Sequence, residues 1–183
     1  MKLYKYILLI TLKVFLLIFL FNSNLYASNI KNSATVFMYH KFGVSKYPST
    51  SVTIDQLESH VQELTKEKYN ILSLDYIINT IINDGDLPNN TVGISVDDAD
   101  KSFFEVGWPL FKKNSIPVTL FVTTGTIANN NKSYLNWDQI RKLKEEGVTI
   151  GAHSHTHAHM PDISFEEVKK EIELSNKIFL KEL

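Results

Sequence analysis

The stretch Thr91-Val92-Gly93-Ile94-Ser95-Val96-Asp97-Asp98 decides the fold of this chain. Residues 91–96 are mostly apolar and rich in β-branched side chains, which predicts a strand. Two carboxylates follow directly where that strand would end. In α/β folds the chemistry lies at the carboxyl ends of the parallel strands. The pair Asp97-Asp98 is therefore the first candidate for a functional site.

Strand and helix signals alternate on both sides of this stretch. Strands are expected at residues 35–39, 70–74, 91–96, 118–122 and 148–152, with helices between them. This alternation predicts an α/β fold with mostly parallel strands.

Several helix boundaries carry their own signals. Capping boxes at 53–56 and 164–167 mark two helix starts. Asp75 is expected to cap a third helix, and a helix that starts at Asn136 is expected to stop at Gly147. The final helix shows an apolar stripe made of Phe165, Val168, Ile172 and Phe179.

A second polar cluster, His153-Ser154-His155-Thr156-His157, follows the strand expected at 148–152. Aspartate and histidine together suit a borderline divalent metal such as zinc. A catalytic zinc site typically has three protein ligands and one open position, and Asp98, His153 and His157 would supply those three. A carboxylate that does not bind the metal, such as Asp97, could then act as a general base.

Each cluster also has a simpler interpretation. An aspartate pair at a strand end is often a helix N-cap, and alternating histidines can form a metal-sequestering tract or a solvated loop. The occurrence of both clusters at strand ends of one α/β chain favours a shared metal site.

These motifs resemble the polysaccharide deacetylases of the NodB-homology type (carbohydrate esterase family 4). Residues 95–99 line up with the family motif Thr-Phe-Asp-Asp-Gly, and residues 153–157 match the motif His-Ser/Thr-x-x-His. Residues 109–122 and 135–139 resemble the segments around and between the motifs. The opening Phe37-Met38-Tyr39-His40 is similar to the biofilm-polysaccharide branch. The resemblance covers nearly all of the chain after residue 27.

The resemblance implies a NodB-type distorted (β/α) barrel, of which this chain holds only the N-terminal part. It implies that Asp97 is the catalytic base, and that Asp98, His153 and His157 bind a divalent metal, zinc in the first place with cobalt or nickel as alternatives. It makes His40 the general acid, although His40 could instead be a buried histidine bonded to backbone.

A second histidine register is open, because residues 155–159 also fit His-Thr-x-x-His. We prefer the first register, since Ile150-Gly151-Ala152-His153 resembles the lead-in of the family motif.

The sequence departs from the family pattern in three ways. Ala99 replaces the motif glycine, which matters only if that position needs a positive φ. Val96 replaces phenylalanine. An Arg-Pro motif and a Leu-x-His motif would lie beyond Leu183. We therefore expect residues 28–183 to form a partial domain that is poorly stable or poorly active alone, with open sheet edges.

The implied activity is hydrolysis of N-acetyl groups on an N-acetylhexosamine polysaccharide, whether chitin-like, peptidoglycan or exopolysaccharide. Two alternatives stay open. The chain could be a truncated, non-catalytic remnant that binds metal or glycan, or a metal hydrolase of the same fold that acts on another amide or ester.

Composition and the N-terminal sequence limit the partners, the kinds of site and the cellular location that can be expected. A chain of 183 residues suffices for one domain, and a net charge of -1 gives no indication of a nucleic-acid partner. The absence of cysteine excludes disulfides and thiolate zinc sites. Residues 1–27, with a basic start and an apolar run at 7–21, predict a signal peptide and export to the periplasm, cell envelope or exterior. An uncleaved N-terminal membrane anchor is the alternative, and nothing indicates an oligomeric state.

Overall fold

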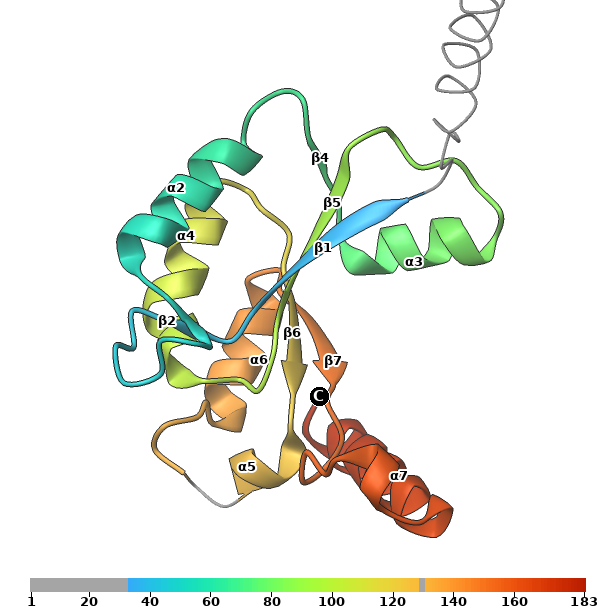
Figure 1. Cartoon of the computed structure of the whole chain (residues 1–183). Coiled ribbons are helices and arrows are strands. Elements are labelled where there is room, and N and C mark those ends of the chain that lie inside the picture. The colour runs from blue at the N-terminus through green and yellow to red at the C-terminus, as the bar shows by residue number, and fades with distance from the viewer. Residues whose placement is uncertain (1–32, 129–130) are drawn as a thin grey trace, which may run out of the picture. The chain divides into compact units, whose positions relative to one another are not determined.

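Strand β5 (Thr91–Val96) lies at the centre of a five-stranded parallel sheet (Figure 1), in a computed structural model that describes residues 33–128 and 131–183. All six residues of β5 are buried. It pairs along its whole length with β1 (Ala34–Tyr39), through its first two residues with β4 (Asn70–Ile71), and through its last two with β6 (Thr119–Val122). Strand β7 (Thr149–Ala152) extends the sheet beyond β6. The predicted α/β fold with parallel strands is confirmed, while the predicted signal peptide lies outside the described residues.

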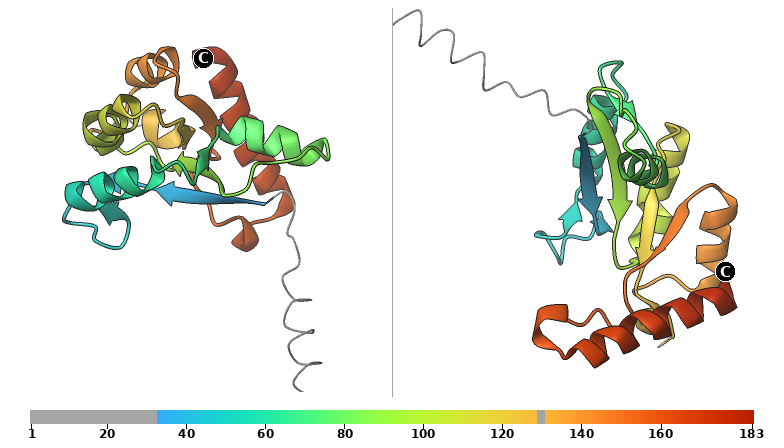
Figure 2. Two further views of the ribbon diagram at one scale, coloured as in Figure 1. Left: turned by 90° about the horizontal axis from the view of Figure 1, so that it is seen from above. Right: turned by 90° about the vertical axis from the view of Figure 1, so that its right-hand side faces the viewer.

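Helices and short turns connect the strands (Figure 2). They are α2 (Ile54–Leu64), α3 (Leu74–Ile82), the π-helical turn η1 (Phe103–Gly107), α4 (Trp108–Lys113), α5 (Thr124–Ala128), α6 (Trp137–Glu145), the 3₁₀ turn η2 (Met160–Asp162) and α7 (Phe165–Glu182). A small parallel pair, β2 (Lys41–Phe42) and β3 (Ser51–Val52), follows β1. Neither this pair nor α5 was expected from the sequence, because such short elements show no periodicity.

Most of the predicted helix boundaries are confirmed. Thr53, Asn136 and Ser164 each accept a hydrogen bond from the backbone N–H three residues later, with the reciprocal bond also formed. The prediction for Asp75 is wrong. The N-cap of α3 is Ser73, whose side chain accepts from the Tyr76 N–H, and Asp75 lies in the first turn, where a negative charge still favours the helix dipole.

Strand β5 packs on both of its faces. Val92, Ile94 and Val96 belong to the main hydrophobic core, which also contains Phe111. Gly93 faces α3, and a Cβ at this position would lie 2.5 Å from Leu74 Cδ2. Helix α3 therefore reaches the sheet only because residue 93 has no side chain.

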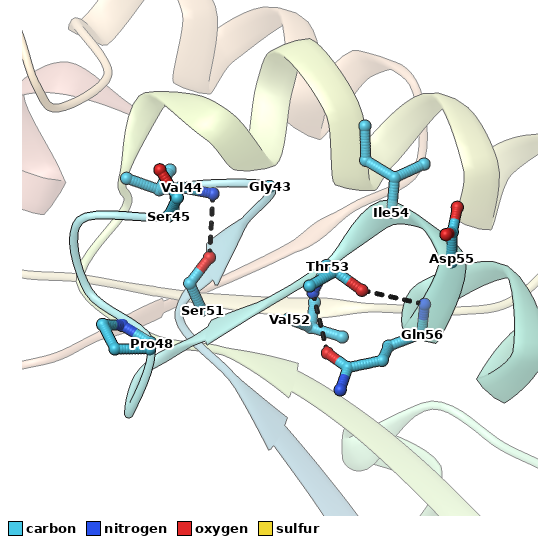
Figure 3. A pocket seen from close by; sticks show the side chains of 10 residues that line it. All are labelled: Gly43, Val44, Ser45, Pro48, Ser51, Val52, Thr53, Ile54, Asp55 and Gln56. Carbon is cyan, nitrogen blue, oxygen red and sulfur yellow. Dashed lines mark hydrogen bonds between the residues drawn. The ribbon is translucent and has the colours of Figure 1, made fainter.

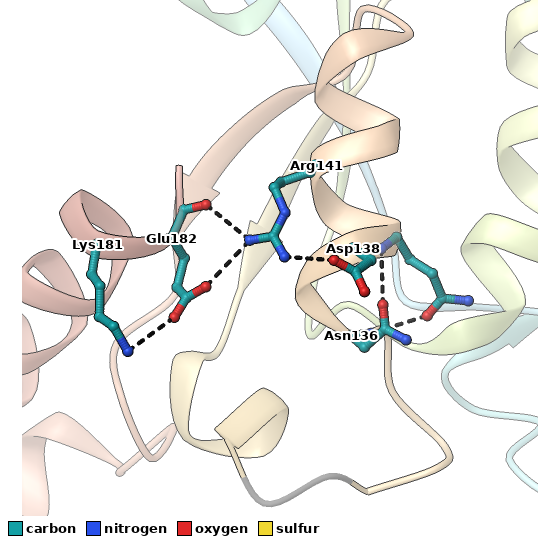
Figure 4. Close-up of polar contacts among 6 residues, drawn as sticks. Asn136, Asp138, Arg141, Lys181 and Glu182 are labelled. Atoms are coloured by element: carbon teal, nitrogen blue, oxygen red, sulfur yellow. Dashed lines mark hydrogen bonds and ion pairs between the residues drawn. The ribbon is translucent and has the colours of Figure 1, made fainter.

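The C-terminal end of helix α7 contacts α6. The Phe179 ring packs edge-on against Trp137 of α6, with 5.9 Å between ring centroids. Arg141 Nη1 donates to the backbone and side-chain oxygens of Glu182 at 3.1 and 3.2 Å (Figure 4). The predicted apolar stripe is wrong at its N-terminal end, because Phe165 is 78% exposed and Ile172 is 49% exposed. Phe179, the member of the stripe that contacts α6, packs against the core.

Strand β1 exposes apolar side chains at an end of the sheet. Within the described residues β1 pairs only with β5 and β7 pairs only with β6. Val36, Phe37 and Met38 are all exposed, Met38 by 60%. An exposed apolar edge strand favours pairing with another chain. Among the described residues, no helix is both long and apolar enough to cross a membrane.

We expect purified residues 28–183 to self-associate through β1, and Met38→Lys to reduce this association, because a charged side chain disfavours pairing at a sheet edge. Sedimentation velocity over a range of concentrations measures the effect. Ile82→Lys is the matched control, since Ile82 is more exposed than Met38 but lies at the end of α3. Equal association of the two variants and the parent would contradict the prediction.

Candidate metal centre

The turn after β5 directs Asp98 away from the strand. The Asp97 N–H donates to the Tyr39 carbonyl at 2.9 Å, so the β1–β5 ladder extends to Asp97. The backbone then turns at Asp98 (φ 70°) and Ala99 (φ 58°). The Leu135 N–H donates to the Ala99 carbonyl at 2.9 Å and holds this turn in place.

The histidine loop after β7 has a similar construction. The His153 N–H donates to the Val122 carbonyl at 3.0 Å, which continues the β6–β7 ladder. Ser154 (φ 59°) and His157 (φ 61°) are left-handed, and the His157 N–H donates to Ser154 Oγ at 3.1 Å. Four of the seven non-glycine residues with positive φ in the described part of the chain lie in this loop or in the turn after β5. Such backbone strain is concentrated at functional sites in proteins.

Asp98, His153 and His157 form the group of side chains that could hold a metal ion. The two histidine Nε2 atoms lie 3.1 Å apart, and Asp98 Oδ1 lies 3.6 Å from His153 Nε2 and 3.5 Å from His157 Nε2. A tetrahedral zinc ion with bonds of about 2.0–2.1 Å holds its ligands about 3.3–3.4 Å apart. The triangle of donor atoms therefore fits one face of a zinc coordination tetrahedron and leaves the fourth corner open.

Phe121 of β6 packs beside the first of these histidines. Its ring centroid lies 6.3 Å from that of His153. A Cβ on Gly151, its partner in the β6–β7 register, would lie 2.6 Å from the Phe121 ring. The absence of a side chain at residue 151 thus allows the ring to lie against the sheet and support the imidazole.

Asp97 does not belong to the group formed by Asp98, His153 and His157, and it is only 8% exposed. Its Oδ1 atom is buried and has no hydrogen-bond partner among the described residues. Burial raises the pKa of Asp97, and the nearby His153 and His40 oppose that rise. Asp97 therefore offers a carboxylate oxygen that protein groups do not neutralise, which suits a general base.

His40 lies at the carboxyl end of β1, directly after Tyr39, which is paired with Val96. The register brings His40 to the same edge of the sheet as Asp97, where its effect opposes the rise that burial causes in the pKa of Asp97. The side chain is partly exposed. The general-acid role of His40 stays a prediction.

The alternative histidine register does not converge on Asp98. His155 Nδ1 lies 2.9 Å from Thr124 Oγ1, and His159 Nδ1 lies 2.8 Å from Asp162 Oδ2 on the surface. Glu171 of α7 lies near this loop and was not predicted from the sequence, because no local pattern marks it. It accepts hydrogen bonds from residues 155 and 156.

A pocket of about 540 Å³ lies between the β2–β3 loop and the start of α2 (Figure 3). None of the metal-site residues lines it. Several of its polar groups already bond to one another, including Val44 N–H to Ser51 Oγ and the reciprocal pair of Thr53 and Gln56. The Thr53–Gln56 pair caps α2, and the bond from Val44 to Ser51 closes the β2–β3 loop.

The fold and the site together define a parallel α/β protein with an Asp-His-His cluster at the carboxyl ends of its strands. Residues 84–182 match the family described as polysaccharide deacetylase, and the chain belongs to this family.

Relatives with known names agree with this assignment. The chain is 28% identical over 148 residues to a poly-beta-1,6-N-acetyl-D-glucosamine N-deacetylase of Staphylococcus aureus, covering 80% of this chain and 51% of that protein. It is 29% identical over 144 residues to the protein of the same name from Staphylococcus epidermidis, covering 69% and 49%. The chain thus spans about half the length of the curated relatives it matches.

Solved structures share the fold. The deacetylase PplD of Streptococcus pyogenes, solved in complex with acetate, superposes with a TM-score of 0.74 at 23% identity, covering 84% of this chain and 70% of that one. IcaB from Ammonifex degensii gives a TM-score of 0.60 at 22% identity, covering 67% and 53%. The expected likeness to NodB-type deacetylase folds is confirmed.

The positive φ of Ala99 predicts which side chains this position tolerates. Ala99→Gly relieves the left-handed strain but loses a buried methyl group, so we expect the free energy of unfolding to change by less than about 1 kcal/mol. Ala99→Val adds a β-branched side chain where φ is positive and where no space is left, and we expect a loss of at least about 2 kcal/mol. Urea denaturation of the two variants measures both effects. Equal stability of the two variants would contradict the prediction.

Proposed function

We propose that this chain carries the metal site of a polysaccharide N-deacetylase, which removes acetyl groups from N-acetylhexosamine polymers. The observation that carries the proposal is the triangle of Asp98, His153 and His157 donor atoms beside the buried Asp97, in a member of the polysaccharide deacetylase family. Acetate release from a panel of N-acetylglucosamine polymers, with and without a chelator, tests it. Release that does not depend on metal would contradict the proposal.

Each side chain of the site has a distinct part in this hydrolysis. Asp98 and the Nε2 atoms of His153 and His157 hold the divalent ion, which supplies Lewis-acid polarisation of the acetamide carbonyl and activation of water. Asp97 accepts a proton from the attacking water, and its burial makes it a stronger base than an exposed aspartate. His40 donates a proton to the departing amine nitrogen. The products are acetate and a free amine on the sugar.

A borderline metal fits this set of donors. Two imidazole nitrogens and one carboxylate suit zinc, and cobalt or nickel accept similar ligands. We propose zinc because the three donor distances match a tetrahedral face.

The proposed substrate follows from the relatives and from the surroundings of the site. The staphylococcal relatives are named for poly-beta-1,6-N-acetyl-D-glucosamine. A pocket of about 300 Å³ lies beside the turn after β5, lined mainly by polar side chains that include Lys101, Tyr134 and Gln139. Tyr134 is close enough to Asp98 for the carboxylate to raise its pKa, after the larger effect of burial. A pocket of this kind offers hydrogen bonds to sugar hydroxyl groups. Export through residues 1–27 would bring the chain to such a polymer outside the cytoplasm.

A second candidate function is metal binding without turnover. The observation that favours it is the exposed apolar edge at β1. In that case the Asp-His-His group would bind metal while acetate release stayed at the level of the metal-free protein. The acetate assay and a metal titration on the same sample separate the two functions.

Alanine variants of two histidines test the ligand register. We expect His153→Ala to lose the bound metal, because it removes one of three donors, and His159→Ala to keep it, because His159 bonds to Asp162 instead. Metal content after dialysis, measured by plasma emission spectrometry, gives the answer. Loss of metal only in His159→Ala would assign the ligands to the other register.

A substitution at Asp97 separates the base from the ligands. We expect Asp97→Asn to retain the metal and to lose about 10²- to 10⁴-fold in turnover, because the general base is removed and the donor triangle is not. Acetate release and metal content are measured on the same preparation, with Asp75→Asn on the exposed side of α3 as the control. Near-full activity of Asp97→Asn, or its failure to bind metal, would show that the roles of Asp97 and Asp98 are assigned wrongly.

A further inference from the structure

Glu171 of α7 holds the loop that joins the two histidine ligands. One carboxylate oxygen, Oε2, accepts from the His155 N–H at 3.0 Å and from the Thr156 N–H at 2.7 Å. The other, Oε1, accepts from Thr156 Oγ1 at 2.7 Å. A single side chain therefore takes three hydrogen bonds from the loop, and all three come from the two residues in its middle.

Two successive backbone N–H groups that point the same way form a small anion-binding concavity. Hydrogen bonds to an ionised acceptor are roughly twice as strong as neutral ones. Burial acts to raise the pKa of Glu171, but the bonds from Thr156 and His155 outweigh it, and the net effect lowers the pKa. The carboxylate is therefore ionised at neutral pH, in the form that binds these N–H groups best.

The opposite side of the loop is fixed by the turn that begins α5. The Gly125 N–H donates to the His155 carbonyl at 2.7 Å, and Thr124 Oγ1 lies 2.9 Å from His155 Nδ1. A Cβ on Gly125 would lie only 2.6 Å from that carbonyl oxygen, so no larger residue allows the same approach. The loop is held between α5 and Glu171, and the left-handed residues Ser154 and His157 lie on either side of the held segment.

We propose that Glu171 is a positioning residue for the metal site, which keeps His153 and His157 at the separation that one ion requires. The inference rests on the proposed metal-binding function of these histidines. Glu171 is not one of the candidate ligands, since both of its oxygens are directed to the loop and it lies outside the Asp-His-His group. It acts by offsetting the cost of the strained loop, so that the two imidazoles are already in place when the ion binds.

The support for Glu171 is itself anchored. At its C-terminal end α7 is tied to α6 through Arg141 and Glu182, and Lys144 Nζ donates to the Leu183 carbonyl at 3.0 Å (Figure 4 shows the Arg141 contacts). The helix therefore connects the outer surface of α6 to the metal loop.

Metal affinity of the full chain tests the inference, with zinc and cobalt each titrated against a competing chelator. We expect Glu171→Gln to weaken binding by about 10- to 100-fold, the loss typical for residues that orient metal ligands. Glu173→Gln is the matched control, because Glu173 lies two residues away on α7 and, among the described residues, pairs with Lys169 alone, at 3.9 Å. Thr156→Val, which removes one of the three bonds, should cause a smaller loss. The thermal midpoint in the presence of EDTA should be lower for Glu171→Gln than for Glu173→Gln, because the loop loses a tether whether or not an ion is bound.

The outcomes distinguish this inference from the proposed function. If the parent chain binds neither ion, the proposed metal site fails and the inference fails with it. If the parent binds and Glu171→Gln binds equally well, only the inference is overturned. An equal loss in Glu173→Gln would also overturn it, because the effect would then belong to the charge of the helix. If Glu171→Gln does not fold, Thr156→Val decides, and unchanged affinity in that variant refutes the role of Glu171.

Discussion

The parallel pairing of β5 with its neighbours is the constraint on which the rest of this structure depends. Because parallel strands end at the same edge of a sheet, β1, β5 and β7 bring His40, the aspartate pair and the histidine loop to one place. Complete burial of β5 fixes its register, since a slip by one residue would turn Ile94 and its apolar neighbours away from the core. The hydrophobic core therefore brings the segments that carry the candidate ligands to one edge of the sheet.

Strained turns, in contrast, are what direct the side chains toward each other. Asp98 and His157 both have left-handed backbones, each of which costs of order 1–3 kcal/mol unless the surroundings hold it. Hydrogen bonds from other segments hold both turns in place. Leu135 bonds to the turn after β5, while Gly125 and Glu171 bond to the histidine loop from opposite sides. The strain is thus balanced by contacts from elements that lie far away in the sequence.

This distribution explains what the sequence could and could not predict. Strand β5, the caps at Thr53 and Ser164, and the two ligand motifs are local signals, and the structure has them where the sequence placed them. Serine and aspartate cap helices about equally well, so the prediction of Asp75 missed Ser73, which only the geometry selects. The exposure of Phe165 depends on what packs against α7, and the contact of Glu171 links residues that are 15 and 16 positions apart. No local sequence pattern predicts the exposure of Phe165 or the contact of Glu171.

The neighbouring carboxylates Asp97 and Asp98 lie in different environments because the backbone changes direction at Asp98. Asp97 still follows the β5 ladder and stays buried, whereas the chain turns at Asp98, whose carboxylate reaches the two imidazoles. Burial raises the pKa of Asp97, while the positive charge of a bound divalent ion would lower it. These two effects on the pKa of Asp97 oppose each other. In the proposed function the adjacent pair therefore divides the two tasks of holding a metal and accepting a proton.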